Sequence, residues 1–145
     1  MSDDNNLEQL QVLLADYSVF YQKLRNYHWN VKGPMFFELH AKFEELYLDT
    51  ANKVDEIAER IVTKNGTVPG TLAVYLETSR LEEGRATDAL DMVRDLVGDF
   101  GKLTAALREG AATADAAGDA ATMNLLEGFA DEQEKTAWMF RAFLG

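Results

Sequence analysis

The chain has 145 residues and a mass of 16.2 kDa, a length that fits one domain spanning residues 1–145. It contains no cysteine, which excludes disulfides, thiol nucleophiles and thiolate zinc sites, and its formal net charge of −11 opposes binding to nucleic acid. The apolar runs are short and the start, MSDDNN, is acidic, so we expect no membrane span, no cleaved signal peptide and a cytoplasmic protein.

The first half of the chain has the apolar spacing of two long helices. Apolar residues recur at three- and four-residue steps up to the pair Gly33-Pro34, which predicts a helix over residues 5–31. The same spacing resumes after this pair and predicts a second helix over residues 35–64, which Asn65-Gly66 would end. The tight turn between them makes an antiparallel hairpin.

The second half predicts a long connection followed by two more helices. Residues 65–86 hold three glycines and a proline around the short apolar piece 72–76, which is typical of a crossover with one small helix. From Thr87, a candidate N-cap, the spacing predicts a third helix that fades within residues 110–118, and Asp119 can cap a fourth. The fold class is therefore all-α: a ferritin-like four-helix bundle with one long crossover carrying a short helix.

The two histidines of the chain stand on either side of the first turn. His28 precedes Gly33-Pro34 by about as many residues as His40 follows it, so an antiparallel hairpin brings them to the same height. Both a metal site and ordinary hydrogen-bonded histidines fit this arrangement. The Glu-x-x-His motifs of a di-iron site inside a bundle are absent, because Arg25 and Phe37 occupy the positions three residues before the histidines.

Three carboxylates share a face of the second predicted helix with His40. At about 100° per residue, positions 40, 44, 55 and 59 fall at about 0°, 40°, 60° and 100°, so Glu44, Asp55 and Glu59 lie within one arc. A solvated acidic stripe is the structural alternative. Nitrogen and oxygen ligands without sulfur suit Fe(II), Mn(II) or Zn(II), so the pattern favours a metal site that uses these residues.

The distance along the helix divides this site in two. His40 and Asp55 are separated by 15 residues, or about 22 Å of helix, which one metal ion cannot bridge. Either the chain has two unrelated half-sites, or a second copy packs antiparallel about a two-fold axis and brings its carboxylates to this chain's histidines. Trp29, next to His28, suits two compatible roles: an electron donor to a reactive oxidant, and an indole packed at the subunit contact.

These residues resemble one known family. The runs NYHWNVKGP at 26–34, FFELHAKFEELY at 36–47, DEIAER at 55–60 and WMFRAFL at 138–144 are similar in order and spacing to the Dps proteins, or mini-ferritins, also called DNA-binding proteins from starved cells. The likeness covers nearly the whole chain.

The resemblance implies a homo-oligomeric shell of twelve copies with mono-iron or di-iron ferroxidase centres shared across two-fold interfaces. His28 and His40 match the histidine ligands of one subunit, and Asp55 and Glu59 match the carboxylates of its partner. Glu44 stands where the family often has aspartate and is a further candidate ligand. The implied function is oxidation of Fe(II), preferably by hydrogen peroxide, with storage of ferric oxide inside the shell and protection against oxidative damage.

Two further expectations concern partners. By resemblance, Asp115 and Asp119 lie where acids often line an iron entry pore. Family members that bind DNA commonly use basic tails, which this chain lacks, so we expect no DNA binding. The alternatives are a nucleoid-binding structural protein in which iron oxidation is secondary, and a shell that holds zinc or manganese without turnover.

Overall fold

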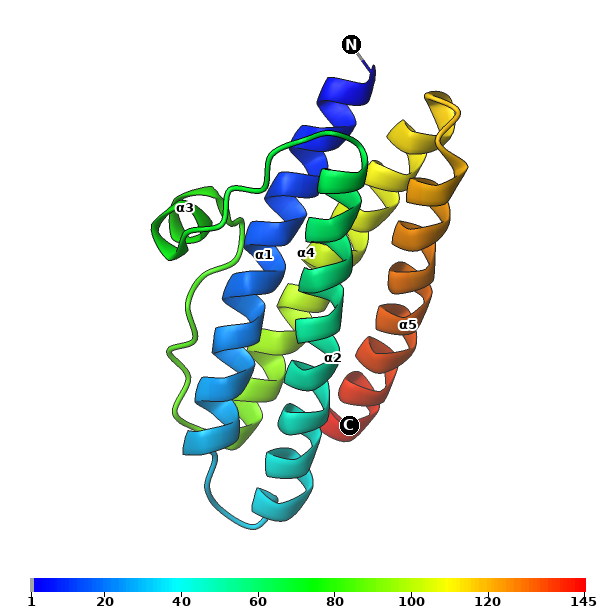
Figure 1. Cartoon of the computed structure of the whole chain (residues 1–145). Coiled ribbons are helices and arrows are strands. Elements are labelled where there is room, and N and C mark those ends of the chain that lie inside the picture. The colour runs from blue at the N-terminus through cyan, green and yellow to red at the C-terminus, as the bar shows by residue number, and fades with distance from the viewer. Residues whose placement is uncertain (1) are drawn as a thin grey trace.

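Five helices make up the computed structural model, which describes residues 2–145, with side chains from Asn5 onward (Figure 1). They are α1 (Ser2–Asn30), α2 (Phe36–Thr63), α3 (Leu72–Thr78), α4 (Ala89–Ala116) and α5 (Ala120–Leu144). The four long helices form a bundle and the short α3 lies in the crossover, which confirms the expected all-α architecture. No helix of the described chain is long and apolar enough to cross a membrane.

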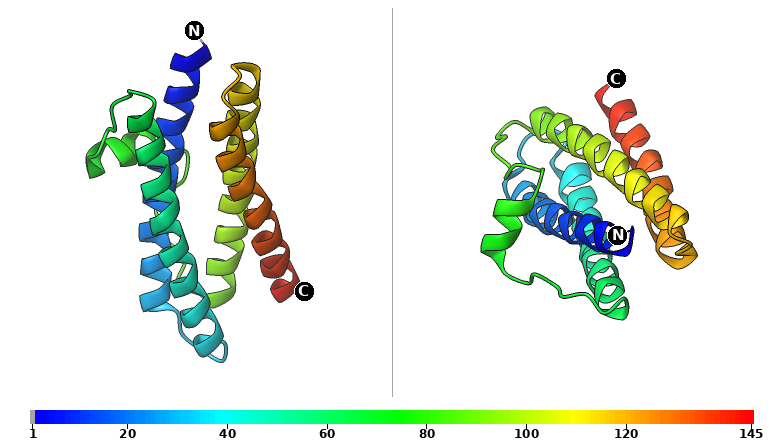
Figure 2. Two further views of the ribbon diagram at one scale, coloured as in Figure 1. Left: turned by 45° about the vertical axis from the view of Figure 1, so that its right-hand side comes forward. Right: turned by 90° about the horizontal axis from the view of Figure 1, so that it is seen from above.

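The long helices pair as two antiparallel hairpins, α1 with α2 and α4 with α5, which lie side by side (Figure 2). Helix α1 packs against α2, α4 and α3, so it is covered on several sides. This explains why its buried residues are not confined to one stripe: Leu13, Leu14 and Ala15 are consecutive and each is at most 1% exposed. Helix α1 therefore contributes buried side chains from several of its faces.

The helix ends follow the expected chemistry with one exception. Asp119 caps α5 as expected, because its side chain accepts a hydrogen bond from the Thr122 N–H. Helix α4 ends at Ala116, inside the predicted segment. The prediction of Thr87 as its N-cap was wrong, since Asp88 caps the helix. The Asp88 carboxylate accepts from two backbone N–H groups, and its charge is more favourable than a hydroxyl at a helix N-terminus.

A buried ion pair joins α1 to α4. The Nζ atom of Lys23 lies 2.7 Å from an oxygen of Asp99 and 3.3 Å from Asp95. The side chains of Lys23 and Asp99 are 1% and 5% exposed. Burial raises the pKa of Asp99 to about 6, against the opposing effect of Lys23. The two hairpins are thus linked by a buried ion pair. Removal of either partner would leave the other charge buried and uncompensated.

The end of the crossover is fastened to α1 beside this pair. The Tyr27 hydroxyl donates to Asp95 and accepts from the Ala86 N–H at 3.4 Å, while the Asn26 amide donates to the Gly84 carbonyl at 3.1 Å. A Cβ atom on Gly84 would lie 2.8 Å from the Lys23 side chain. Glycine at this position therefore lets the crossover lie directly on α1. The contact reaches Tyr27, the residue before His28.

Asp99 predicts a pH dependence of stability. Its pKa is higher in the folded chain than the ordinary value of 3.8, so the folded state binds more protons between these values. The stabilisation due to Asp99 is therefore complete at low pH and falls as pH rises through about 6. We expect the free energy of unfolding of the wild type, relative to Asp99→Asn, to fall by up to about 3 kcal/mol between pH 4 and pH 7.

Urea unfolding at one protein concentration across this pH range measures the difference. The matched control is Asp91→Asn, on the same helix, whose side chain is 60% exposed and lacks the burial of Asp99. An Asp99→Asn difference that is independent of pH would contradict the assignment.

Candidate metal centre

The candidate metal centre contains a pair of stacked histidines. His28, from the last turn of α1, and His40, from the start of α2, have ring centroids 3.8 Å apart and planes inclined by 14°. The Nδ1 atom of each lies 2.7–2.8 Å from the backbone oxygen of the other. The structure therefore confirms that the hairpin brings the two histidines face to face.

This pairing decides which nitrogen of each ring is available to a metal. A carbonyl oxygen only accepts hydrogen bonds, so each Nδ1 carries the hydrogen and donates it. The lone pair of each neutral ring is then on Nε2, and a backbone acceptor on the opposite nitrogen orients the ring and strengthens it as a ligand. In this arrangement Nε2 is the nitrogen of each ring through which a metal can bind.

The turn between α1 and α2 creates this geometry. Gly33 has a φ of 105°, a conformation that glycine adopts without strain, and its carbonyl accepts the Phe36 N–H at 3.0 Å. The Phe36 ring then stacks on His40 at 4.8 Å, and the Tyr47 ring meets His28 edge-on at 5.4 Å. Aromatic contacts thus hold both imidazoles, and His28 is only 7% exposed.

The carboxylates divide into two groups. Glu44 is exposed one turn after His40, and its Oε1 accepts a hydrogen bond from the Tyr47 hydroxyl at 3.5 Å. Asp55 and Glu59 are also exposed but lie about 22 Å or more along the helix from His40. The described residues of the single chain contain no cluster of three or more His, Asp or Glu side chains arranged to hold a metal ion. One chain thus carries a histidine half-site and a carboxylate half-site that are too far apart to bind the same metal ion.

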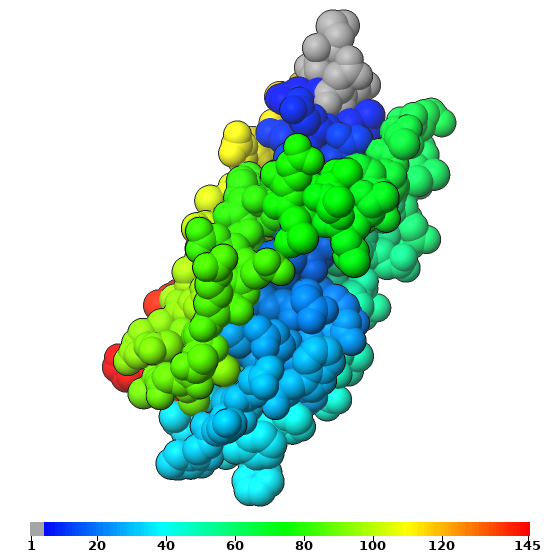
Figure 3. Space-filling model, turned by 90° about the vertical axis from the view of Figure 1, so that its left-hand side faces the viewer, coloured from blue at the N-terminus to red at the C-terminus, as the bar shows by residue number. Residues whose placement is uncertain are grey.

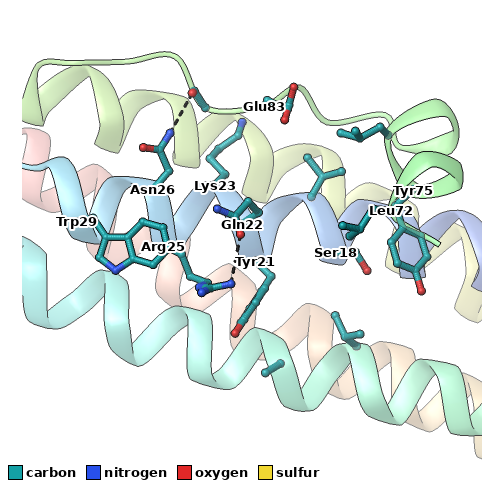
Figure 4. A pocket seen from close by; sticks show the side chains of 15 residues that line it. Ser18, Tyr21, Gln22, Lys23, Arg25, Asn26, Trp29, Leu72, Tyr75 and Glu83 are labelled. Carbon is teal, nitrogen blue, oxygen red and sulfur yellow. Dashed lines mark hydrogen bonds between the residues drawn. The ribbon is translucent and has the colours of Figure 1, made fainter. Parts of the chain in front are cut away.

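A groove of about 670 Å³ lies on the same hairpin, where the crossover passes over α1 (Figure 3). Trp29, Arg25 and Tyr21 from α1 line it together with Leu72 from α3 (Figure 4). The Arg25 guanidinium carbon is 4.9 Å from the Trp29 ring centroid and 5.2 Å from that of Tyr21. Trp29 is 56% exposed and Leu72 is 79% exposed. The hairpin and the crossover thus present exposed apolar side chains along this groove.

Asp115 and Asp119 lie in different environments. Asp115 is exposed. Asp119 pairs with Arg60 at 3.0 Å and with Lys64, in addition to capping α5. Partial burial raises the pKa of Asp119, but hydrogen bonds from Lys64 and Thr122 outweigh this effect and hold the pKa well below its usual range. The negative charge of Asp119 is therefore already balanced by Arg60 and Lys64 of the same chain.

Sequence reasoning did not identify Tyr21 and Tyr47 as part of the surroundings of the histidines. Tyr21 lies seven residues before His28 and Tyr47 seven residues after His40, so each shares a helix face with its histidine. The rings of the two tyrosines meet edge-on at 5.9 Å. Their symmetric spacing about the turn is a signal that could have identified them.

Comparison with known proteins shows the family of the chain. A family model described as a ferritin-like domain matches residues 7–145. The chain is 44% identical over 139 residues to DNA protection during starvation protein 2 of Bacillus anthracis, covering 95% of each chain.

Solved structures give the same result. The crystal structure of Dps from Staphylococcus aureus superposes with a TM-score of 0.96 at 38% identity, over 98% of this chain and 96% of that one. A Dps protein from Vibrio cholerae, described as a member of a superfamily of ferritin-like diiron-carboxylate proteins, has a TM-score of 0.96 at 39% identity, over 99% and 91%. The chain therefore belongs to the Dps family of ferritin-like proteins.

Proposed function

We propose that this chain is a cytoplasmic ferroxidase and iron store that oxidises Fe(II), preferably with hydrogen peroxide, inside a shell of twelve copies. The observation that carries the proposal is the stacked pair of imidazoles with both Nδ1 atoms bound to backbone carbonyls, which leaves Nε2 of each oriented ring for a metal. Membership of a family with a diiron-carboxylate relative supports iron as the metal.

A second copy would complete the site. Packed antiparallel about a two-fold axis, it would bring its Asp55 and Glu59 to the histidines of the first chain, and the same operation would create a second, identical site. Exposure of both carboxylates leaves them free for such a contact. The apolar rim of the groove, with Trp29 and Leu72, provides surface that a second copy can bury.

The donor set suits oxidation of bound Fe(II). Imidazole nitrogen and carboxylate oxygen bind Fe(II), and the negative carboxylates stabilise the additional charge of Fe(III). Two Fe(II) ions supply the two electrons that, with two protons, convert one hydrogen peroxide to two water molecules. Simultaneous transfer of both electrons avoids release of hydroxyl radical, and this is the protective part of the proposed function.

We propose that protection comes from iron chemistry and not from coating DNA. The chain has 25 acidic residues against 14 Lys and Arg, and an assembly of twelve copies multiplies this excess. Duplex DNA is repelled by such a surface at ordinary salt. We therefore favour a ferroxidase over a nucleoid-binding structural protein.

Replacing both histidines tests the reaction. In the variant with His28→Ala and His40→Ala we expect the rate of Fe(II) oxidation by peroxide to fall by at least about tenfold, since loss of ligands costs at least as much as loss of their supporting contacts. Spin-trapped hydroxyl radical should rise. The measurement is Fe(III) absorbance after anaerobic loading and addition of peroxide.

The double substitution Asp55→Asn and Glu59→Gln provides a second variant, since both side chains are exposed and their loss should not disturb the core. Asn30→Ala, exposed beside the histidines, is the control and should behave as wild type. Equal oxidation rates in all four proteins would show that these residues have no ferroxidase role.

Mixing the two defective chains tests whether the site is shared. A chain lacking the histidines and a chain lacking Asp55 and Glu59 should each be inactive alone. After joint refolding, half of randomly formed dimers are mixed and each has one intact site, so activity should return to about one quarter of wild type. Separate affinity tags verify that hybrids form. Hybrids with no recovered activity would mean that each site lies within one chain.

A further inference from the structure

We propose that Tyr47 is the electron donor that completes the reduction of hydrogen peroxide when a site holds only one Fe(II). This inference rests on the proposed ferroxidase function. With a single Fe(II), only one of the two required electrons is present, and a hydroxyl radical forms unless the protein supplies the second. The donor must lie beside the histidines and must be able to lose a proton together with its electron.

Tyr47 meets these requirements through its contacts. Its ring meets His28 edge-on, with centroids 5.4 Å apart and planes inclined by 74°, so it touches a proposed ligand directly. Its hydroxyl donates a hydrogen bond to Glu44 Oε1 at 3.5 Å, which gives the phenolic proton a nearby carboxylate acceptor. The ring also meets Tyr21 edge-on at 5.9 Å. Tyr47 therefore contacts both a proposed ligand and a second aromatic ring.

The chemical step balances with the reactants of the proposed function. Fe(II) gives one electron, and Tyr47 gives one electron and its phenolic proton, which Glu44 accepts and passes on to the peroxide oxygen. With one further proton from solvent, the O–O bond of hydrogen peroxide is cleaved to two water molecules. The products are Fe(III) and a neutral phenoxyl radical on Tyr47, so no hydroxyl radical leaves the site.

The electrostatics favour Tyr47 over Trp29 as this donor. The Arg25 guanidinium lies 4.9 Å from the centroid of the Trp29 ring, and its attraction depends on the electron density of that ring. Removing an electron from Trp29 would place two positive charges near one another. Tyr47 instead faces the carboxylate of Glu44, and its oxidised form is neutral because the proton leaves as well.

The test is freeze-quench EPR on the assembled protein, loaded anaerobically with one Fe(II) per site and mixed with hydrogen peroxide. We expect a radical whose hyperfine pattern changes when the protein contains ring-deuterated tyrosine. The signal should be lost in Tyr47→Phe, which keeps the ring contacts, and spin-trapped hydroxyl radical should rise. Tyr21→Phe, the matched control, removes the neighbouring hydroxyl and should keep the signal, as should Trp29→Phe.

Fe(III) absorbance recorded on the same samples separates this inference from the function it rests on. Iron oxidation that depends on His28 and His40 but leaves no tyrosine-derived radical in the unmodified protein overturns the role of Tyr47 alone. A radical that persists in Tyr47→Phe, or disappears only in Trp29→Phe, also overturns it. Absence of histidine-dependent iron oxidation overturns both proposals.

Discussion

The reciprocal hydrogen bonds between His28 and His40 are the interaction on which the proposed chemistry depends. Each Nδ1 donates to the backbone oxygen of the other residue at 2.7–2.8 Å, so one contact fixes the ring orientation, the tautomer and the register of α1 against α2. A metal site is assembled at lower cost when its ligands are already oriented. The turn at Gly33 and the rings of Phe36 and Tyr47 hold the pair in this geometry.

The straightness of α2 is the second constraint. A continuous helix from Phe36 to Thr63 cannot return Asp55 to His40, so in the proposed site the carboxylates come from another copy whose helix runs the opposite way. Two-fold symmetry would then make two complete sites from two incomplete chains. Assembly and activity would thus be coupled, because a single chain lacks the full set of ligands. The crossover, fastened to α1 next to His28, shapes the face on which the second copy would lie.

Much of this architecture is readable from the sequence, for identifiable reasons. The hairpin, the crossover and the facing histidines follow from helical periodicity and from Gly33-Pro34, which are local signals. The hydrogen bonds of the imidazoles and the ring contacts of Tyr47 depend on side-chain packing across the hairpin, which spacing alone does not determine. Thr87 and Asp88 are neighbouring cap formers, and only the backbone conformation shows which of them caps the helix.

The most direct measurement is anomalous diffraction at the iron edge from crystals of the assembled protein loaded anaerobically with Fe(II). We expect an iron peak bonded to Nε2 of at least one of His28 and His40 in one copy, and to Asp55 and Glu59 of the copy related by a two-fold axis. Iron held by residues of one chain only, or no iron beside the histidines, would contradict the shared site.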